Sequence, residues 1–141
     1  MININRVLKD DRLMRATIGL PITGFENLVD EFTKSYWDIK EKQYQKGIKN
    51  RTRKRKPGGG RKGNLANVEL KLFFILLYFK CYPTMDLTGL MFDLDRFNVK
   101  HSVDNLTPVL ERTLGRTLSL PKRKIRTLEE FIELIPEAKD C

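Results

Sequence analysis

The chain has 141 residues, which is enough for one domain with a short appendage and a moderate hydrophobic core. Apolar residues make up 40% of the sequence and charged residues 32%, so we expect part of the chain to lie outside the core. The formal net charge is +9, and nine of the 27 basic residues lie between Lys46 and Gly63 without any Asp or Glu. The remaining 18 basic residues are balanced by 18 acidic ones, so the excess charge is local. Such a block indicates a polyanionic partner, either nucleic acid or an anionic membrane.

Cysteine usage and hydropathy exclude several classes of protein. Cys81 and Cys141 are far apart and stand in no metal-binding or redox spacing, so we interpret them as reduced thiols. The N-terminus has no signal-peptide pattern, and the apolar run at 70–79 is shorter than the roughly 20 residues that span a bilayer. We therefore expect a cytoplasmic, nucleoid-associated protein without a membrane partner.

The N-terminal segment, residues 1–47, is predicted to be helical. A first amphipathic helix is expected from Val7 to Ile18, and Thr23 with Glu26 matches a capping box that opens a second helix. The apolar residues of this second helix fall on one stripe, with Trp37 beside it: Phe25, Leu28, Val29, Phe32, Tyr36 and Ile39. Two interpretations stay open: the stripe packs on the core, or residues 24–40 pair with a second copy to form a homodimer.

Residues 48–63 are predicted to form a flexible basic arm, because Pro57 and the following glycines oppose regular structure. Cations beside Pro and Gly can lie along a narrow groove of DNA. We expect the arm to contact the DNA backbone through Arg51, Arg53, Lys54, Arg55, Lys56, Arg61 and Lys62. The alternative is an ordinary solvated linker.

Residues 64–115 are predicted to contain three packed helices. The nearly unbroken apolar run from Leu70 to Phe79 favours a helix that is buried on most sides and ends at Pro83. Thr84 should cap a second helix, whose buried face would consist of Leu87, Leu90, Met91 and Leu94. Asp95 should cap a third helix, whose inward face would consist of Val99, Val103 and Leu106.

Two short helices with a tight connection are typical of a helix-turn-helix unit. In such a unit the last helix carries polar groups that can form hydrogen bonds with base edges. The candidates for reading bases are the outward residues near the start of that helix: Arg96, Asn98, Lys100 and His101. Thr107 and Pro108 should begin a separate helical turn that Gly115 closes. The expected fold class is all-α: a three-helix helix-turn-helix unit with an additional N-terminal helical segment and a flexible basic linker.

Three motifs together resemble a known family: Gly-Gly-Gly-Arg-Lys at 58–62, a Leu/Phe-rich helix that ends in Tyr-Pro-Thr at 82–84, and Leu-x-x-Leu-Met-Phe at 87–92. The chain resembles, over about residues 53–115, the N-terminal helix-turn-helix domain of bacterial insertion-sequence transposases of the DDE endonuclease superfamily. The resemblance implies a module that binds double-stranded DNA at the terminal repeats of a transposon.

The resemblance also implies that such a module precedes a ribonuclease-H-like domain, in which three carboxylates hold two divalent metals. In the family the first of these carboxylates lies in an Asp-Gly-Thr-Glu motif, which this chain lacks. We therefore expect residues 116–141, with a basic linker and a capping box at Thr127 and Glu130, to lead to a missing catalytic domain. A separate upstream reading frame, a frameshift and a truncation are all compatible with this expectation.

The residues themselves give no sign of catalysis. His101 is the only histidine, and the sequence has no Ser/His/Asp set, no metal-ligand spacing and no phosphate-binding loop motif. We therefore predict no catalytic residues, no metal and no cofactor. Two other functions stay open: a nonspecific nucleic-acid binder in which only the arm matters, and an inhibitory partner that pairs with the full-length transposase.

Overall fold

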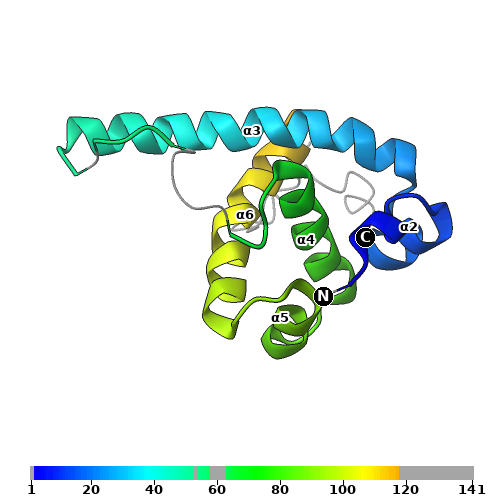
Figure 1. Cartoon of the computed structure of the whole chain (residues 1–141). Coiled ribbons are helices and arrows are strands. Elements are labelled where there is room, and N and C mark those ends of the chain that lie inside the picture. The colour runs from blue at the N-terminus through cyan, green and yellow to red at the C-terminus, as the bar shows by residue number, and fades with distance from the viewer. Residues whose placement is uncertain (1, 53, 58–62, 118–141) are drawn as a thin grey trace, which may run out of the picture.

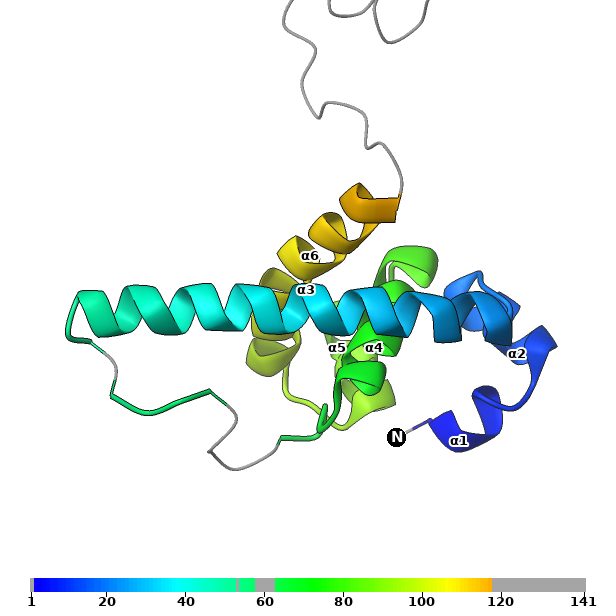
Figure 2. The same ribbon diagram turned by 90° about the horizontal axis from the view of Figure 1, so that it is seen from above.

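The computed structural model describes residues 2–52, 54–57 and 63–117, and all regular structure in this part of the chain is helical. The helices are α1 (Ile4–Val7), α2 (Asp11–Ile18), α3 (Ile22–Lys49), α4 (Val68–Cys81), α5 (Met85–Phe92) and α6 (Arg96–Thr117). The long helix α3 lies across the ends of α4 and α6, and α5 lies at their opposite end (Figure 1). The C-terminal half of α3 extends beyond α6, as the view from above also shows (Figure 2). The all-α prediction is confirmed for the described residues.

One hydrophobic core joins the N-terminal helices to the central ones. Phe25 and Phe32 of α3 are fully buried, and the ring centroids of Phe25 and Phe73 lie 6.4 Å apart in a T-shaped contact. The α4 rings of Phe73 and Phe74 pack in turn against Phe92 of α5 at 6.3 and 5.0 Å. Each fully buried side chain of this size contributes roughly 1.5–3 kcal/mol. The stripe on α3 therefore packs on the core of its own chain.

Capping side chains define the ends of the central helices. Thr84 Oγ1 accepts from the Leu87 N–H at 3.1 Å, and Asp95 Oδ1 accepts from the Asn98 N–H at 2.7 Å, so both predicted caps are confirmed. Helix α4 is buried on most sides, as expected, and begins at an unpredicted cap, Asn67, whose side chain accepts from the Leu70 N–H. It ends where Tyr82 adopts a left-handed conformation (φ 47°), one residue before Pro83.

The start of the chain differs from the prediction in two places. The helix expected at 7–18 is divided, because Asp10 caps α2 by accepting from the backbone N–H groups of Arg12 and Leu13. The capping box expected at Thr23 does not form, since α3 already begins at Ile22. The Ile22 N–H donates instead to Asp11 Oδ1 of α2 at 2.9 Å, so a carboxylate distant in sequence replaces the local cap.

Helix α3 also continues further than the apolar stripe. It ends at Lys49, so Ile48 and Lys49, the first two residues of the predicted arm, are helical. Arg53 and residues 58–62 of the arm lie outside the described residues, as do the linker and short helix predicted within 118–141.

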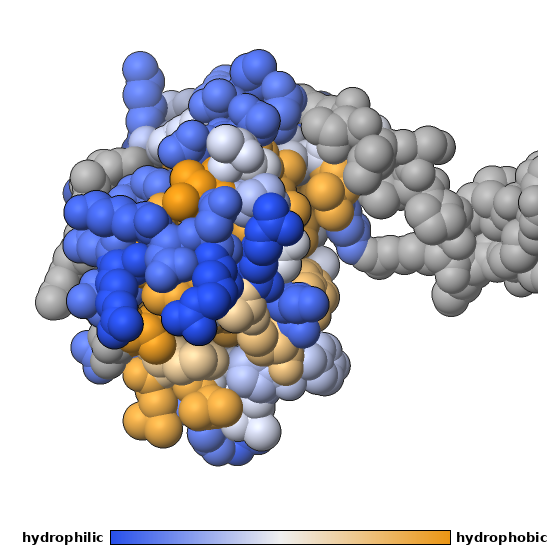
Figure 3. Space-filling view, turned by 90° about the vertical axis from the view of Figure 1, so that its right-hand side faces the viewer, coloured by the Kyte–Doolittle hydropathy of each residue, from blue (hydrophilic) through white to orange (hydrophobic). Residues whose placement is uncertain are grey.

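The predicted inward face of α5 is half correct: Met91 and Leu94 are partly buried against the core, but the two other leucines are exposed. Leu87 is 49% exposed and Leu90 is 74% exposed, whereas Thr88, Gly89 and Phe92 are buried. The helix is rotated because Phe92 packs on the rings of α4 and because Gly89 allows the following turn to approach closely. Figure 3 accordingly shows hydrophobic surface at the lower end of the molecule, where α5 lies in Figure 1.

The third predicted helix is longer than expected. Its inward face is confirmed, since Val99 and Leu106 are buried and Val103 packs against the core. However, α6 continues through Pro108 to Thr117 instead of restarting at Thr107. A proline inside a helix costs about 3 kcal/mol, and the burial of Val109 and Leu110 on the same inward face offsets that cost.

Candidate nucleic-acid interface

The connection between α5 and α6 is short and closely packed. Helix α5 ends at Phe92 and α6 begins at Arg96, so the turn has three residues, 93–95. Asp93 adopts a left-handed conformation (φ 56°), which directs the Leu94 N–H back to the Gly89 carbonyl oxygen at 2.9 Å. A Cβ atom on Gly89 would lie 2.4 Å from the Leu94 carbonyl oxygen. The turn therefore disfavours any residue larger than glycine at this position and fixes how α6 leaves α5.

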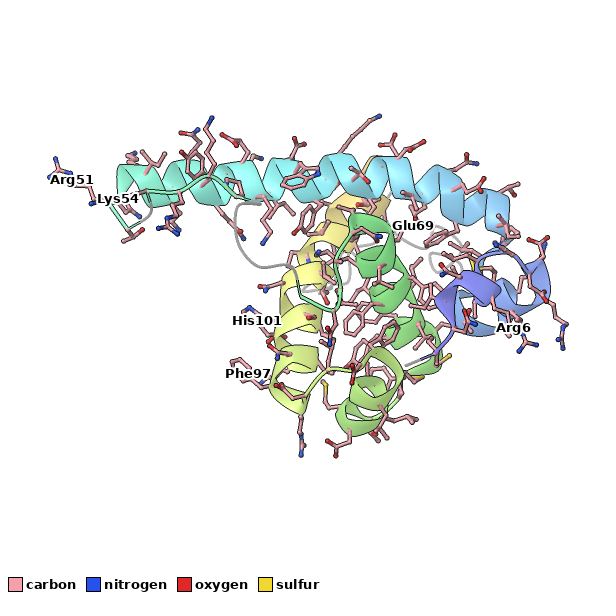
Figure 4. The ribbon with its side chains drawn as sticks, viewed as in Figure 1. Arg6, Arg51, Lys54, Glu69, Phe97 and His101 are labelled. Carbon is pink, nitrogen blue, oxygen red and sulfur yellow. The ribbon has the colours of Figure 1, made fainter. Side chains whose placement is uncertain are left out.

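The four base-reading candidates all lie on the exposed surface of α6: Arg96, Asn98, Lys100 and His101. Phe97 is 75% exposed, and its ring stacks on His101 with a centroid distance of 6.0 Å and an interplanar angle of 7°. Figure 4 shows both rings projecting from the side of α6 that faces away from α4. This face therefore combines cationic, amide and aromatic groups, all of which can contact bases or phosphates.

Two of these side chains already have partners, one at the N-cap of α6 and one within the helix. Asn98 Nδ2 donates to Asp95 Oδ2 at 3.0 Å, and Asn105 Nδ2 lies 3.0 Å from His101 Nε2. Both contacts are exposed to solvent. In the free protein these hydrogen bonds limit the rotamers of Asn98 and His101. A base that forms a hydrogen bond with either side chain would replace only a weak, solvent-exposed hydrogen bond.

The described backbone candidates do not gather around α6. Arg51, Lys54, Arg55 and Lys56 are exposed, and Arg51 has a left-handed backbone (φ 57°) just after α3 ends. Arg51 and Lys54 lie near the far end of α3, well beyond Phe97 and His101 but on the same side of the molecule (Figure 4). Arg53, Arg61 and Lys62 lie outside the described residues.

A cavity of about 480 Å³ lies in the corner between α3 and α6, and we call it the corner cavity. Its charged and aromatic residues are Lys40 and Tyr36 from α3 and Lys71 from α4. Amide and hydroxyl side chains complete its polar lining: Gln43, Asn64, Asn98, Ser102 and Asn105. This cavity is not predicted from the sequence, because its residues come from segments that are distant in sequence.

The polar groups of the corner cavity are held in place by the fold. Lys40 Nζ and Lys71 Nζ lie 5.5 and 5.6 Å from the centroid of the Tyr36 ring, within the range of cation–π attraction. Lys71 Nζ also donates to the Leu65 carbonyl oxygen at 2.7 Å. Burial raises the pKa of the Tyr36 hydroxyl above its ordinary value, so Tyr36 remains a neutral hydrogen-bond donor at physiological pH.

Searches for other kinds of site give no candidate in the described part of the chain. No group of three or more His, Cys, Asp or Glu residues within 2–52, 54–57 and 63–117 is arranged to hold a metal ion. Across the same ranges no helix combines the length and apolar character needed to cross a bilayer.

Comparison with protein-family models, with curated proteins and with solved structures finds no match for this chain.

Proposed function

We propose that this chain is the DNA-binding part of an insertion-sequence transposase and has no catalytic residues of its own. In this proposal α4, α5 and α6 form a helix-turn-helix unit that binds the terminal repeats of a transposon, and the basic arm adds affinity. One observation carries the proposal: a three-residue turn closed on Gly89 presents the start of α6 with exposed Arg96, Asn98, Lys100 and His101.

The chemistry of this face suits base recognition. Arginine can form two hydrogen bonds with guanine and asparagine two with adenine, each pair being worth about 1–3 kcal/mol of discrimination. A recognition helix reads bases mainly with residues near its N-terminus, which is where Arg96 and Asn98 lie. Neither residue is buried, so either can be replaced without disturbing the core.

The test is competitive binding of terminal-repeat and scrambled duplexes at one fixed salt concentration. Arg96→Ala and Asn98→Ala should each reduce the preference for the terminal repeat by roughly ten-fold or more. Arg6→Ala is the matched control, because Arg6 is an exposed arginine of α1 on the opposite side of the molecule (Figure 4). Equal preference of the wild type for both duplexes would refute sequence-specific recognition.

A nonspecific nucleic-acid binder is the second candidate, favoured by the concentration of the whole excess charge between Lys46 and Gly63. If about half of these nine cations contact phosphates, log K against log salt should have a slope of about −4 for duplex DNA. Replacing residues 53–56 with alanine should flatten this slope and weaken binding to all duplexes alike. The second candidate holds if the wild type shows this slope but no sequence preference.

A further inference from the structure

The corner cavity has the charge and the donors of an anion site. Two ammonium groups, Lys40 and Lys71, line it, and none of the 14 described residues that line it is Asp or Glu. The remaining polar side chains are amides and hydroxyls, which can donate hydrogen bonds to an oxyanion. Its volume of about 480 Å³ exceeds what one phosphate group needs, so a phosphate can enter together with a neighbouring sugar or water.

The ammonium groups are arranged before any ligand arrives. Both lie on the ring of Tyr36, and Lys71 is further held by the Leu65 carbonyl oxygen. A lysine that is already positioned loses less side-chain entropy when it binds an anion.

The two sides of α6 differ in charge. On the side of α5, a shallow hollow at the start of α6 is lined by Asp86, Asp93 and Asp95, together with Arg96. On the side of α3, the described lining of the corner cavity includes Lys40 and Lys71 and no carboxylate. A phosphate chain that runs beside α6 is repelled on the first side and attracted on the second.

The cavity also opens beside the residues that would contact DNA. Asn98 and Asn105 belong both to its lining and to the exposed surface of α6. A duplex whose bases face Asn98 therefore brings a backbone phosphate close to the mouth of the cavity. The basic arm leaves the core at the far end of α3 and returns at Gly63, which itself lines the cavity.

We propose that the corner cavity is a phosphate site that receives one backbone phosphate of the bound DNA, with Lys40 as its main cationic contact. The inference rests on the proposed function, because it names the place where the same DNA would be held beside α6. Lys71 and Tyr36, which line the same cavity, position this contact. Such a contact fixes the register of the duplex on α6 without reading its sequence.

The experiment compares Lys40→Met with Lys42→Met, which removes the same charge from an exposed residue of α3 that does not line the cavity. Lys40→Met should weaken duplex binding by about ten-fold or more and reduce the salt slope by about one, because a charge-assisted contact is lost. Lys42→Met should change the affinity by less than about two-fold. Equal losses in both variants would overturn the proposal, because they would indicate only general electrostatic attraction. Thermal unfolding monitored by circular dichroism checks that both variants remain folded.

Two further measurements separate the source of the phosphate from the site itself. A duplex with a single neutral methylphosphonate should bind the wild type less well than the unmodified duplex does, but only when the substitution stands at one particular backbone position. Lys40→Met should bind that modified duplex and the unmodified duplex with equal affinity. Inorganic phosphate, titrated against the wild type by NMR, should shift the amide signals of Gln43 and Ser102 to saturation, and should not do so in Lys40→Met. If the wild type binds no duplex, the proposed function fails, and the phosphate titration alone decides whether the site exists. Absence of these shifts in the wild type overturns the site, whatever the DNA result.

Discussion

Replacing Gly89 with alanine tests how tightly the turn between α5 and α6 is packed. The new Cβ would lie 2.4 Å from the Leu94 carbonyl oxygen, so the turn must move by about 1 Å to reach ordinary contact. Forced displacement of this kind typically costs about 1–3 kcal/mol, and more where backbone rather than a side chain must move. Alanine regains about 1 kcal/mol of helix propensity. We expect a net loss of about 1–2 kcal/mol, or roughly 3–8 °C in Tm for a chain of this size.

Urea unfolding followed by circular dichroism measures this loss, and duplex binding of the folded variant measures its effect on α6. Gly63→Ala is the matched control, because a Cβ at Gly63 would meet no atom within 4 Å. The control should be neutral or gain about 0.4–1 kcal/mol from reduced flexibility of the unfolded chain. If Gly89→Ala is more stable than the wild type, the argument is refuted. The gain in helix propensity exceeds the cost only if the turn can move without strain.

Four other substitutions follow from three features of the structure. Ser35 is fully buried, and its hydroxyl has no hydrogen-bond partner among the described residues, so Ser35→Ala should raise the free energy of unfolding in urea by about 1 kcal/mol. Asp93→Gly should raise it by up to about 1 kcal/mol, because glycine adopts the left-handed backbone at this position with less strain than aspartate. Burial raises the pKa of Tyr36, and burial with the nearby Tyr82 raises that of Tyr78, above the ordinary value of 10.0. The folded state therefore keeps protons that the unfolded state releases, so stability is intact below pH 10 and falls as the pH rises through the folded pKa values. Tyr36→Phe and Tyr78→Phe should each reduce that fall in urea titrations on either side of pH 10.

The features that sequence reasoning predicted correctly depend on residues close together in the chain. Thr84 and Asp95 cap helices by reaching an N–H group three residues ahead, so a short sequence window contains the whole interaction. The apolar run from Leu70 to Phe79 specifies a buried helix because hardly any polar residue interrupts it. The stripe that includes Phe25 and Phe32 specifies one buried face of α3 in the same way.

The incorrect predictions concern places where tertiary contacts outweigh local pattern. In α5 the leucine spacing favoured Leu87 and Leu90 as the buried face, but contact with the α4 rings buries Phe92 instead. The start of α3 is capped by Asp11, eleven residues before Ile22, which no local capping pattern reveals. The corner cavity could not be predicted for the same reason, because Lys40 and Lys71 are distant in sequence and come together only at the ring of Tyr36.

The extension of α3 determines where the basic arm begins and ends. The helix continues ten residues past Ile39, which carries the start of the arm about 15 Å away from the core at 1.5 Å per residue. The chain returns at Gly63, which lines the corner cavity, and at Asn64, whose amide donates to the Asp93 carbonyl oxygen. The arm is therefore anchored at both ends, and its second anchor is the turn that orients α6.

Asn64→Ala tests whether this second anchor matters for binding. Loss of an exposed hydrogen bond should lower the free energy of unfolding by only about 0.5–1 kcal/mol. Duplex affinity should fall, because the released end of the arm gains conformational entropy that is lost again on binding. The salt slope should stay unchanged, because no cation is removed. Lys54→Ala provides the contrast, since it removes a charge from the arm and should flatten the slope. If Asn64→Ala binds duplex DNA with wild-type affinity, the anchoring argument is contradicted. The cations of the arm would then bind DNA equally well whether the arm is held at both ends or at one.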